Sequence, residues 1–393
     1  MRRLLCPYCF ESYPPSALGF RCVTPDPTRC PMEEDQHLAR YERMQKGRLL
    51  AHVFLPPRRL LGTVTAATCR CGAKTTKRVC PFCHNELPRE LGLSRSCSIA
   101  LVGAKEVGKS HYIAVLIHQL RNRIGDRFQA AFSALDEQTR RRYSQDFESY
   151  VFQRRIVIPG TLSARAQIGV KYPLIYRFLL EQRGLFVQRP LSTNLVFFDT
   201  AGEDLGHVDT MSTETRYVAQ SQGIIFLLDP LQIPSIRDRM PASVPLPAGT
   251  VNPVEIVERV VDLIRGFRGL KPTQKIDTPV ALAFSKIDAV RSLIDQNSPI
   301  HRVANHDGYF DQSDAEEMNE SMRAHVHSWV GPAFDAAIRH NFKHFMYFGL
   351  SALGAGPDSD GRLQAGATPF RVEDPLLWVL HRHGIIPARR TRR

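Results

Sequence analysis

The most informative part of the chain reads, from residue 96, Ser96-Cys97-Ser98-Ile99-Ala100-Leu101-Val102-Gly103-Ala104-Lys105-Glu106-Val107-Gly108-Lys109-Ser110. Residues 96–102 are largely apolar and predict a buried strand, and residues 103–110 match the pattern G-x-x-x-x-G-K-S. Apolar residues then recur at helical spacing, at Tyr112, Ile113, Val115, Leu116 and Leu120. The pattern therefore lies between a strand and a helix, which is the setting in which such a loop binds phosphate.

A loop of this sequence is expected to hold a nucleoside triphosphate. Gly103 and Gly108 let the backbone curl so that successive N–H groups point at phosphate oxygens, and the positive end of the next helix adds to the attraction. We expect Lys109 to reach the β- and γ-phosphates and to act in catalysis, and the Ser110 hydroxyl to ligate Mg²⁺. A chance match has a probability of about 1% in a chain of 393 residues. The predicted nucleotide-binding residues of the loop are Gly103, Ala104, Lys105, Glu106, Val107, Gly108, Lys109 and Ser110.

A second motif follows another apolar strand. Residues 195–198 are Leu-Val-Phe-Phe, and they lead into Asp199-Thr200-Ala201-Gly202. An aspartate at such a strand end can hold Mg²⁺, and the glycine three residues later can offer its N–H to a γ-phosphate. Hydrolysis would remove that phosphate and release the loop. We therefore predict Asp199 as a magnesium ligand and Gly202 as a nucleotide-binding residue.

Two more strands end in candidate binding residues. Residues 280–284 predict a buried strand that leads into Ser285-Lys286-Ile287-Asp288, and residues 345–350 predict a strand that leads into Ser351-Ala352-Leu353. Each of the four motifs thus lies at the carboxyl end of a predicted strand, and ligands bind at that edge in doubly wound sheets. We therefore predict an α/β fold, the doubly wound and mostly parallel sheet of P-loop NTPases.

The four motifs together resemble those of P-loop GTPases of the translation-factor-related (TRAFAC) class, whose later motifs are D-x-x-G, N/T-K-x-D and S-A-K/L. The resemblance implies that the chain binds and hydrolyses GTP with Mg²⁺. It also implies that Asp288 accepts two hydrogen bonds from guanine, that Lys286 packs on the base, and that the loop at Ser351 and Ala352 closes over it. Ser285 stands where the class has Asn or Thr, which puts the loop-bracing contact of that class in doubt, but not the contact with the base.

The segment between the first two motifs is longer than in small GTPases. Ninety-six positions separate Gly103 from Asp199, and residues 136–155 predict a long charged helix within that gap. The switch-one threonine of the class, a magnesium ligand and catalytic residue, is expected just before the strand that pairs with the one leading to Asp199. Thr161 is the best candidate, although an ordinary loop threonine fits its sequence nearly as well. Thr193 is an alternative that falls in an apparent hairpin turn.

Glu203 follows the second motif, where many members of the class have a glutamine that orients the attacking water. A carboxylate accepts a hydrogen bond from water, but it cannot donate one to the γ-phosphate and it adds negative charge. We therefore expect Glu203 to be a catalytic residue, and hydrolysis to be slow or dependent on a partner.

Eight of the nine cysteines lie in the first 83 residues, and the ninth, Cys97, is expected to be a small buried hydrophobe. Two Cys-Pro-aromatic-Cys turns begin at Cys6 and Cys80. Four thiolates satisfy one tetrahedral zinc ion, and the metal supplies folding energy to a segment with few apolar residues. The predicted zinc ligands, enough for two structural ions, are Cys6, Cys9, Cys22, Cys30, Cys69, Cys71, Cys80 and Cys83.

The simplest grouping of these ligands follows the chain, with the first four around one ion and the last four around the other. A cross-braced grouping is also open. Disulfides would need an oxidising compartment, and the N-terminus lacks the apolar core of a signal peptide. A redox role is disfavoured because neither Cys-x-x-Cys opens a helix after a strand. We therefore predict a small zinc-ribbon-like domain in a cytoplasmic protein.

The composition and the distribution of charge indicate how the chain is divided and which partners it could attract. The chain is 43% hydrophobic and 23% charged, which is globular, and no apolar run approaches the roughly 20 residues that span a bilayer. We divide it into a cysteine-rich domain at 1–95, a GTPase domain with insertions at 96–388 and a basic tail at 389–393. Of the net charge of +13, the first segment carries +8 and the last +4. The basic ends could therefore attract nucleic acid or an acidic partner, or could simply be solvated.

A cysteine-rich ribbon before a TRAFAC-type domain also resembles the bacterial double-GTPase group. That resemblance implies a protein partner or effector, such as a second GTPase, in a multi-component system. Our leading hypothesis is a GTP-binding and GTP-hydrolysing switch whose zinc module reads or transmits the nucleotide state. The alternatives are a zinc-dependent adaptor that binds nucleotide without significant turnover, and an ATPase on the same fold.

Overall fold

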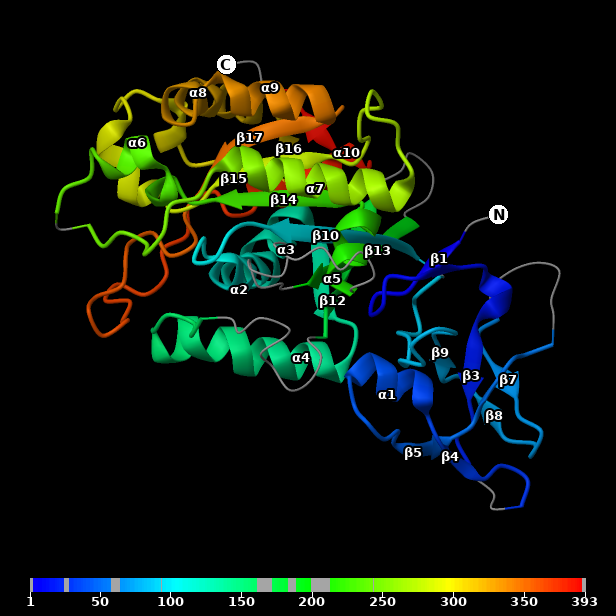
Figure 1. Ribbon diagram of the computed structural model, residues 1–393. Helices are drawn as coiled ribbons and strands as arrows, with labels where there is room; N and C mark the ends of the chain where they lie inside the picture. Colours follow the sequence, from blue (N-terminus) through cyan, green and yellow to red (C-terminus); the bar gives the residue numbers. More distant parts are fainter. Residues whose placement is uncertain are drawn as a thin grey trace.

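A seven-stranded mixed sheet forms the centre of the molecule (Figure 1). The computed structural model describes residues 3–24, 28–57, 64–92, 94–160, 172–182, 189–198, 213–242 and 244–390. The strand order is β11-β12-β13-β10-β14-β15-β17. The strands are β10 (Arg95–Val102), β11 (Ala130–Ala134), β12 (Leu174–Gln182), β13 (Arg189–Phe198), β14 (Gly223–Leu228), β15 (Val280–Phe284) and β17 (Phe345–Gly349).

The sheet is parallel from β13 to β17, and β12 and β11 extend it in antiparallel pairs at one edge. Helices cover both faces, because alternate residues of the central strands are apolar on both sides. In β10, Ala100 and Val102 pack in the core on the side of α7, and Ile99 and Leu101 pack in the core on the side of α2. The predicted doubly wound, mostly parallel α/β fold is confirmed.

The helices on the α7 side are visible above the sheet in Figure 1, and α2 to α4 lie below it. The longer helices are α2 (Lys109–Gln119), α4 (Glu137–Tyr143), α5 (Thr213–Gln220), α7 (Pro253–Arg268), α8 (Gln312–Trp329), α9 (Pro332–Asn341) and α10 (Asp374–Arg382). The short elements are α3 (Gly125–Phe128), α6 (Pro234–Arg237), η5 (Pro230–Gln232), η6 (Ile287–Leu293), η7 (Pro299–His301), β16 (Phe310–Asp311) and β18 (Ala388–Arg389). The π-helical segments η2 (Leu120–Ile124) and η3 (Ser144–Arg154) continue α2 and α4. The helix predicted over residues 136–155 is therefore present.

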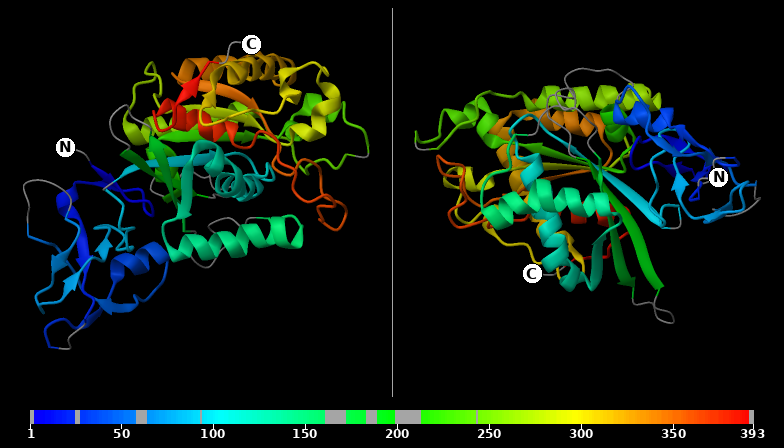
Figure 2. Two further views of the ribbon diagram at one scale, coloured as in Figure 1. Left: turned by 180° about the vertical axis from the view of Figure 1, so that it is seen from behind. Right: turned by 90° about the horizontal axis from the view of Figure 1, so that it is seen from below.

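Residues 3–92, which we call the cysteine module, lie beside one end of this sheet in small sheets of two or three strands (Figure 2). Their strands are β1 (Leu4–Leu5), β2 (Ser12–Tyr13), β3 (Gly19–Arg21), β4 (Met32–Glu34), β5 (Leu49–Ala51), β6 (Val53–Phe54), β7 (Ala67–Thr68), β8 (Lys74–Thr75) and β9 (Arg78–Val79). Two short helices, η1 (Pro15–Ala17) and α1 (Gln36–Glu42), complete the module. The region 1–95 and the tail remain our proposed divisions of the chain.

Two sequence-based expectations about local structure were wrong. Thr193 does not lie in a hairpin turn: it is fully buried within β13, where it pairs with Phe178 and with Arg95. The pair Asp374-Pro375 predicts a helix with Asp374 as its capping residue, but Asp374 does not cap α10, because its carboxylate instead contacts the buried side chains of Arg371 and His306. In both cases a long-range partner replaced the local role that the sequence suggested.

No helix in the described part of the chain combines the length and the apolar character needed to cross a membrane.

Candidate functional site

The glycine loop, residues 103–110, connects β10 to α2 at the carboxyl edge of the sheet. A Cβ atom on Gly103 would lie 2.5 Å from the carbonyl oxygen of Leu227, so only glycine fits there. Gly108 precedes α2 with a φ of +89°, a backbone conformation that residues other than glycine rarely adopt. Both glycines of the predicted pattern are therefore required by the backbone.

Lys109 and Ser110 open α2 at the end of this loop. The Lys109 ammonium is buried and donates hydrogen bonds to the carbonyl oxygens of Gly103, at 2.8 Å, and Ala104, at 3.0 Å. The loop thus wraps around the lysine side chain, and its positive charge lies beside the N-terminal end of a helix. Both features favour an anion at this point.

Ser285 braces the glycine loop from the neighbouring strand. Its hydroxyl lies 3.0 Å from the carbonyl oxygen of Val107 and 3.2 Å from that of Leu228. The loop-bracing contact that the serine put in doubt is therefore present. A single hydroxyl is enough because the ends of β14 and β15 bring Ser285 within reach of the loop.

Lys286 makes a second connection between the two motifs. Its ammonium donates to the carbonyl oxygen of Glu106, at 3.0 Å, and pairs with the Asp229 carboxylate at 2.5 Å. Burial raises the pKa of the Asp229 carboxyl, and the Lys286 charge opposes that rise. The lysine stem therefore runs across the space between the glycine loop and the end of β14.

Asp288 lies in the same turn and has one oxygen without a partner. Its Oδ1 atom is buried and accepts no hydrogen bond from the residues that the structure describes. Such an oxygen is costly to leave unmatched, so this position is suited to a ligand with N–H donors. The N–H of Ile287 donates to the carbonyl oxygen of Leu350, which places the loop that contains Ser351 beside this turn.

The loop after β17 is held in place by its own hydrogen bonds. The backbone of Ser351 pairs with that of Phe370 in both directions, and its hydroxyl accepts a hydrogen bond from the N–H of Gly354 at 2.8 Å. Ala352 follows and is half-buried. Of the predicted base-binding residues, Ser285 and Lys286 thus contact the glycine loop, and the turn that holds Asp288 lies beside the loop of Ser351 and Ala352.

Four predicted site residues lie outside the described residues: Thr161, Asp199, Gly202 and Glu203. Strand β13 ends at Phe198, immediately before the second motif, and α5 begins at Thr213, after it.

The eight cysteines of the module form two clusters, each with its four sulfur atoms within 4.8 Å of one another. Four sulfurs placed about 2.3 Å from a tetrahedral zinc ion lie roughly 3.8 Å apart. The Cys6–Cys83 and Cys9–Cys80 sulfur pairs lie at 3.8 and 3.7 Å, and the other cluster has pairs at 3.6 and 3.3 Å. Both clusters therefore fit a zinc ion.

The clusters are nested, and the predicted grouping along the chain was wrong. We call Cys6, Cys9, Cys80 and Cys83 the inner tetrad, and Cys22, Cys30, Cys69 and Cys71 the outer tetrad. The first and last pairs of the sequence come together because β3 pairs with both β6 and β9 and so folds the module back on itself. The cross-braced alternative, in which pairs alternate, is not observed either.

Comparisons with known proteins give one sequence relative and a group of distant structural ones. No protein-family model matches the chain. Over 332 residues it is 29% identical to the "Putative ESX-1 scaffolding and assembly protein SaeC" of Mycolicibacterium smegmatis, across 78% of this chain and 80% of that protein.

Similar solved structures include the small GTPase Arl6 of Trypanosoma brucei, with 10% identity, 74% of this chain and 98% of that chain covered, and a TM-score of 0.26. They also include Era of Aquifex aeolicus, with 12% identity, coverage of 75% and 58%, and a TM-score of 0.28. At such TM-scores the likeness is slight, and the fold assignment rests on the strand order and glycine loop of this chain.

Three polar residues near these sites were not predicted from the sequence. His111, next to Ser110, accepts a hydrogen bond from the N–H of Ile158 at 2.9 Å, and burial lowers its pKa to about 4. Gln232 donates to the carbonyl oxygen of Lys105 at 2.8 Å, and Nε2 of His52 lies 3.6 Å from the Cys69 sulfur. No spacing rule marks these residues, because each meets a partner that is distant in sequence.

Proposed function

We propose that this protein is a GTP-binding and GTP-hydrolysing switch with two structural zinc ions in its cysteine module. The observation that carries the proposal is the direct linkage of the glycine loop to the Ser285–Asp288 turn through the side chains of Ser285 and Lys286. A phosphate-binding loop and a turn with a buried, unmatched carboxylate oxygen thereby form one continuous site. A guanine nucleotide suits both parts of this site. Its phosphates fit the glycine loop, and the two adjacent N–H donors of its base fit the Asp288 carboxylate.

In this proposal Lys109 and the loop backbone bind the β- and γ-phosphates, and Ser110 ligates Mg²⁺. The ion would neutralise charge on the phosphate oxygens. Phosphoryl transfer depends mainly on positioning and charge neutralisation, so these groups would supply most of the rate enhancement. The roles of Thr161 and Asp199 as magnesium ligands, of Gly202 at the γ-phosphate and of Glu203 near the attacking water belong to the proposal as well. Glu203 would make turnover slow or partner-dependent.

In the cysteine module, the sulfur spacing and the short strands support structural rather than catalytic zinc. Four thiolates per ion leave no open position for a substrate. We also propose a cytoplasmic location, where the thiols that zinc requires stay reduced.

The first test is a competition titration of a fluorescent guanine nucleotide against unlabelled GTP, GDP and ATP, with Mg²⁺ present and zinc retained. We expect GTP and GDP to displace the probe and ATP to fail at the same concentrations. Equal displacement by ATP would remove the base-reading role of Asp288 and favour an ATPase. A turnover assay on the same preparation then separates a hydrolysing switch from a binding protein.

A second role is favoured by the sequence relative, which is named for scaffolding and assembly. We propose that the nucleotide state governs association with a protein partner, such as a second GTPase, in a multi-component system. If nucleotide binds without measurable turnover, the adaptor form of this proposal is preferred. Binding of nucleic acid through the basic ends would be seen as a steep loss of association with added salt.

A further inference from the structure

The inner tetrad is built from two turns with nearly the same backbone. We call residues 6–11 the first knuckle and residues 80–85 the second knuckle. In each, the N–H of the fifth residue donates to the carbonyl oxygen of the first cysteine, at 3.1 Å for Phe10 and 3.0 Å for His84. These two residues also share a left-handed conformation, with φ of 55° and 53°.

The surroundings of the two knuckles differ although their backbones match. The second knuckle faces the cysteine module and solvent: His84 contacts the Asp35 carboxylate at 2.9 Å, and the Phe82 side chain is 48% exposed. The first knuckle faces the large sheet. Phe10 is fully buried there, 5.8 Å from Phe198 and 5.0 Å from Tyr217 between ring centroids.

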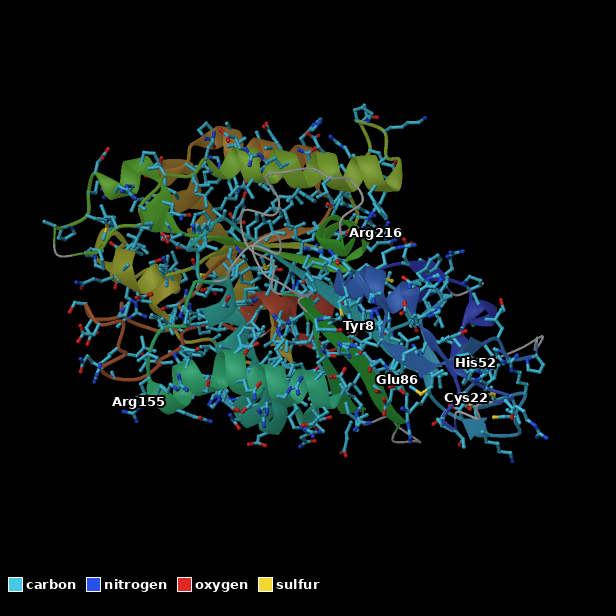
Figure 3. All side chains as sticks on the ribbon, turned by 60° about the horizontal axis from the view of Figure 1, so that its bottom comes forward. Tyr8, Cys22, His52, Glu86, Arg155 and Arg216 are labelled. Atoms are coloured by element: carbon cyan, nitrogen blue, oxygen red, sulfur yellow. The ribbon has the colours of Figure 1, made fainter. Side chains whose placement is uncertain are left out.

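Other contacts of the first knuckle reach the same part of the large domain. Glu11 pairs with Arg216 of α5 at 2.7 Å, and the rings of Tyr8 and Tyr172 meet edge to face at 6.3 Å. Figure 3 shows Tyr8 and Arg216 where the cysteine module meets the large domain, whereas Cys22 and His52 lie at the far side of the module. The inner tetrad therefore borders the large domain, whereas the outer tetrad packs against module residues within the part of the chain that the structure describes.

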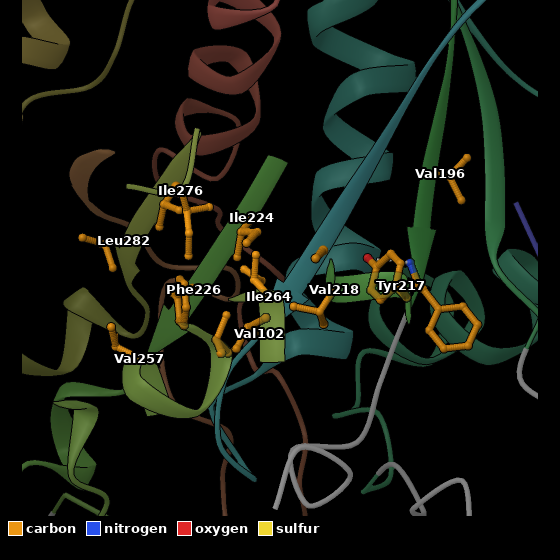
Figure 4. Close-up of a cluster of buried hydrophobic side chains, with 14 of the residues drawn as sticks. Val102, Val196, Tyr217, Val218, Ile224, Phe226, Val257, Ile264, Ile276 and Leu282 are labelled. Carbon is orange, nitrogen blue, oxygen red and sulfur yellow. Dashed lines mark hydrogen bonds between the residues drawn. The ribbon is translucent and has the colours of Figure 1, made fainter. Parts of the chain in front are cut away.

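These contacts lie beside the segments that our proposal assigns to sensing the γ-phosphate. Phe198 directly precedes Asp199, and Tyr217 lies in α5, which begins after that motif. The Tyr217 hydroxyl accepts a hydrogen bond from the N–H of Phe198 at 3.2 Å and donates one to the carbonyl oxygen of Ile99 in β10. Tyr217 is fully buried in the core cluster that Figure 4 shows, and Phe10 packs against the place where β10, β13 and α5 meet.

We infer that metal binding at the inner tetrad and guanine-nucleotide binding are thermodynamically linked through Phe10, and that the outer tetrad is not part of this linkage. This inference rests on the proposed function. The metal would hold the first knuckle in the shape that places Phe10 between Phe198 and Tyr217. The nucleotide that stabilises this packing of Phe10 then raises the affinity of the inner tetrad for its metal. By reciprocity, the bound metal raises the affinity for that nucleotide by the same factor.

The test compares Phe10→Leu with Phe82→Ala, which changes the exposed aromatic ring of the second knuckle. Dissociation constants for GDP and for a non-hydrolysable GTP analogue are measured by fluorescence titration, and the zinc content of each preparation is determined. We expect Phe10→Leu to retain two zinc ions and to change the ratio of the two dissociation constants about fivefold or more, with less than a twofold change for Phe82→Ala. An unchanged ratio in a fully zinc-loaded Phe10→Leu protein overturns the inference.

If Phe10→Leu does not fold, Glu11→Gln removes the contact with Arg216 and takes its place. A second measurement on the unmodified protein follows zinc release to a chromogenic chelator. We expect one of the two ions to be released at a rate that depends on whether GDP or the GTP analogue is bound, and the other at a constant rate. Release of both ions at rates independent of nucleotide overturns the linkage. If the unmodified protein binds no guanine nucleotide at all, the proposed function itself fails, and the two failures are thereby distinguished.

Discussion

The carboxyl edge of the sheet carries the glycine loop and residues 285–288, and we call it the nucleotide edge. This edge and the cysteine module are stabilised by different means. The glycine loop is flanked by fully buried strands and is braced by the side chains of Ser285 and Lys286. Strands in the module are only two or three residues long. Six of the nine exposed large hydrophobic side chains among the described residues also lie in the module: Val23, Met32, Met44, Leu49, Leu55 and Phe82. The first region can therefore exist on its apolar core, whereas the second depends on what joins its cysteines.

Zinc removal should produce the largest difference in stability between the cysteine module and the nucleotide edge. Loss of a structural ion costs on the order of 10 kcal/mol, so we expect chelation, or Cys80→Ser, to unfold residues 3–92 while the large sheet persists. Hydrogen exchange with mass spectrometry would show loss of protection in the module but not in β14 and β15. Cys97→Ala is the matched control, since Cys97 belongs to neither tetrad. Persistent protection of the module without metal would contradict the comparison.

Lys109→Ala should have the opposite pattern, with a large effect on ligand binding and little on zinc content. It removes charge-assisted contacts worth about 1.5–3 kcal/mol each, so affinity for GTP should fall at least about a hundredfold. Fluorescence titration measures this loss, with Lys271→Ala, an exposed lysine outside the loop, as the control. Retained affinity in Lys109→Ala would mean that residues 103–110 do not bind phosphate.

Asp288→Asn tests the base-binding end of the nucleotide edge. Asparagine cannot provide a second acceptor for the two N–H donors of guanine, so we expect the preference for GTP over ATP to fall about a hundredfold. The competition titration gives this ratio directly. Asp295→Asn, an exposed carboxylate nearby in sequence, should leave it unchanged. An unaltered preference in the first variant would leave residues 285–288 as an ordinary turn.

The nucleotide edge should also lose stability in acid through His111. Its pKa is lowered to about 4 from the usual 6.5, because burial disfavours the charged ring and the positive charge of Lys286 disfavours it further. The unfolded chain therefore binds the extra proton first, and this contribution to stability is complete above about pH 6.5 and is lost as the pH falls toward 4. At pH 5 the loss is about 2 kcal/mol. Chemical unfolding at pH 7 and pH 5 should show this loss in the natural chain and not in His111→Gln; equal losses in the two proteins would exclude His111 as the cause.

Ser285→Ala should have the smallest effect. It leaves the carbonyl oxygen of Val107 without its hydroxyl partner, at a cost of about 1 kcal/mol, so nucleotide affinity should fall about fivefold. Ser285→Thr retains the hydroxyl and should restore most of the affinity in the same titration. If alanine and threonine behave alike, the hydroxyl does not brace the loop.

Much of the large domain could be predicted because its signals are local. The strand, loop and helix around residues 96–120 follow one another without interruption. Residues 254–267 carry an amphipathic pattern of helical spacing, and they form most of α7. Expectations were less accurate in the module. Residues 31–48 are rich in charged side chains, a composition typical of a helix, but only Gln36–Glu42 is helical, because the flanking residues pair as β4 and β5. A two-stranded pairing of this kind depends on contacts that a local pattern does not contain.

By itself, the sequence determined which residue types lie at each strand end and that each Cys-x-x-Cys forms one turn. These features depend on neighbours a few residues apart, where spacing and backbone preference decide the geometry. Only the tertiary structure decided that Cys6 meets Cys83 across 77 positions, that Ser285 reaches Val107 across 178, and that Phe10 packs on Phe198. Such pairs are selected by burial and hydrogen bonding in the whole fold, since many alternative pairings are compatible with the same local chain.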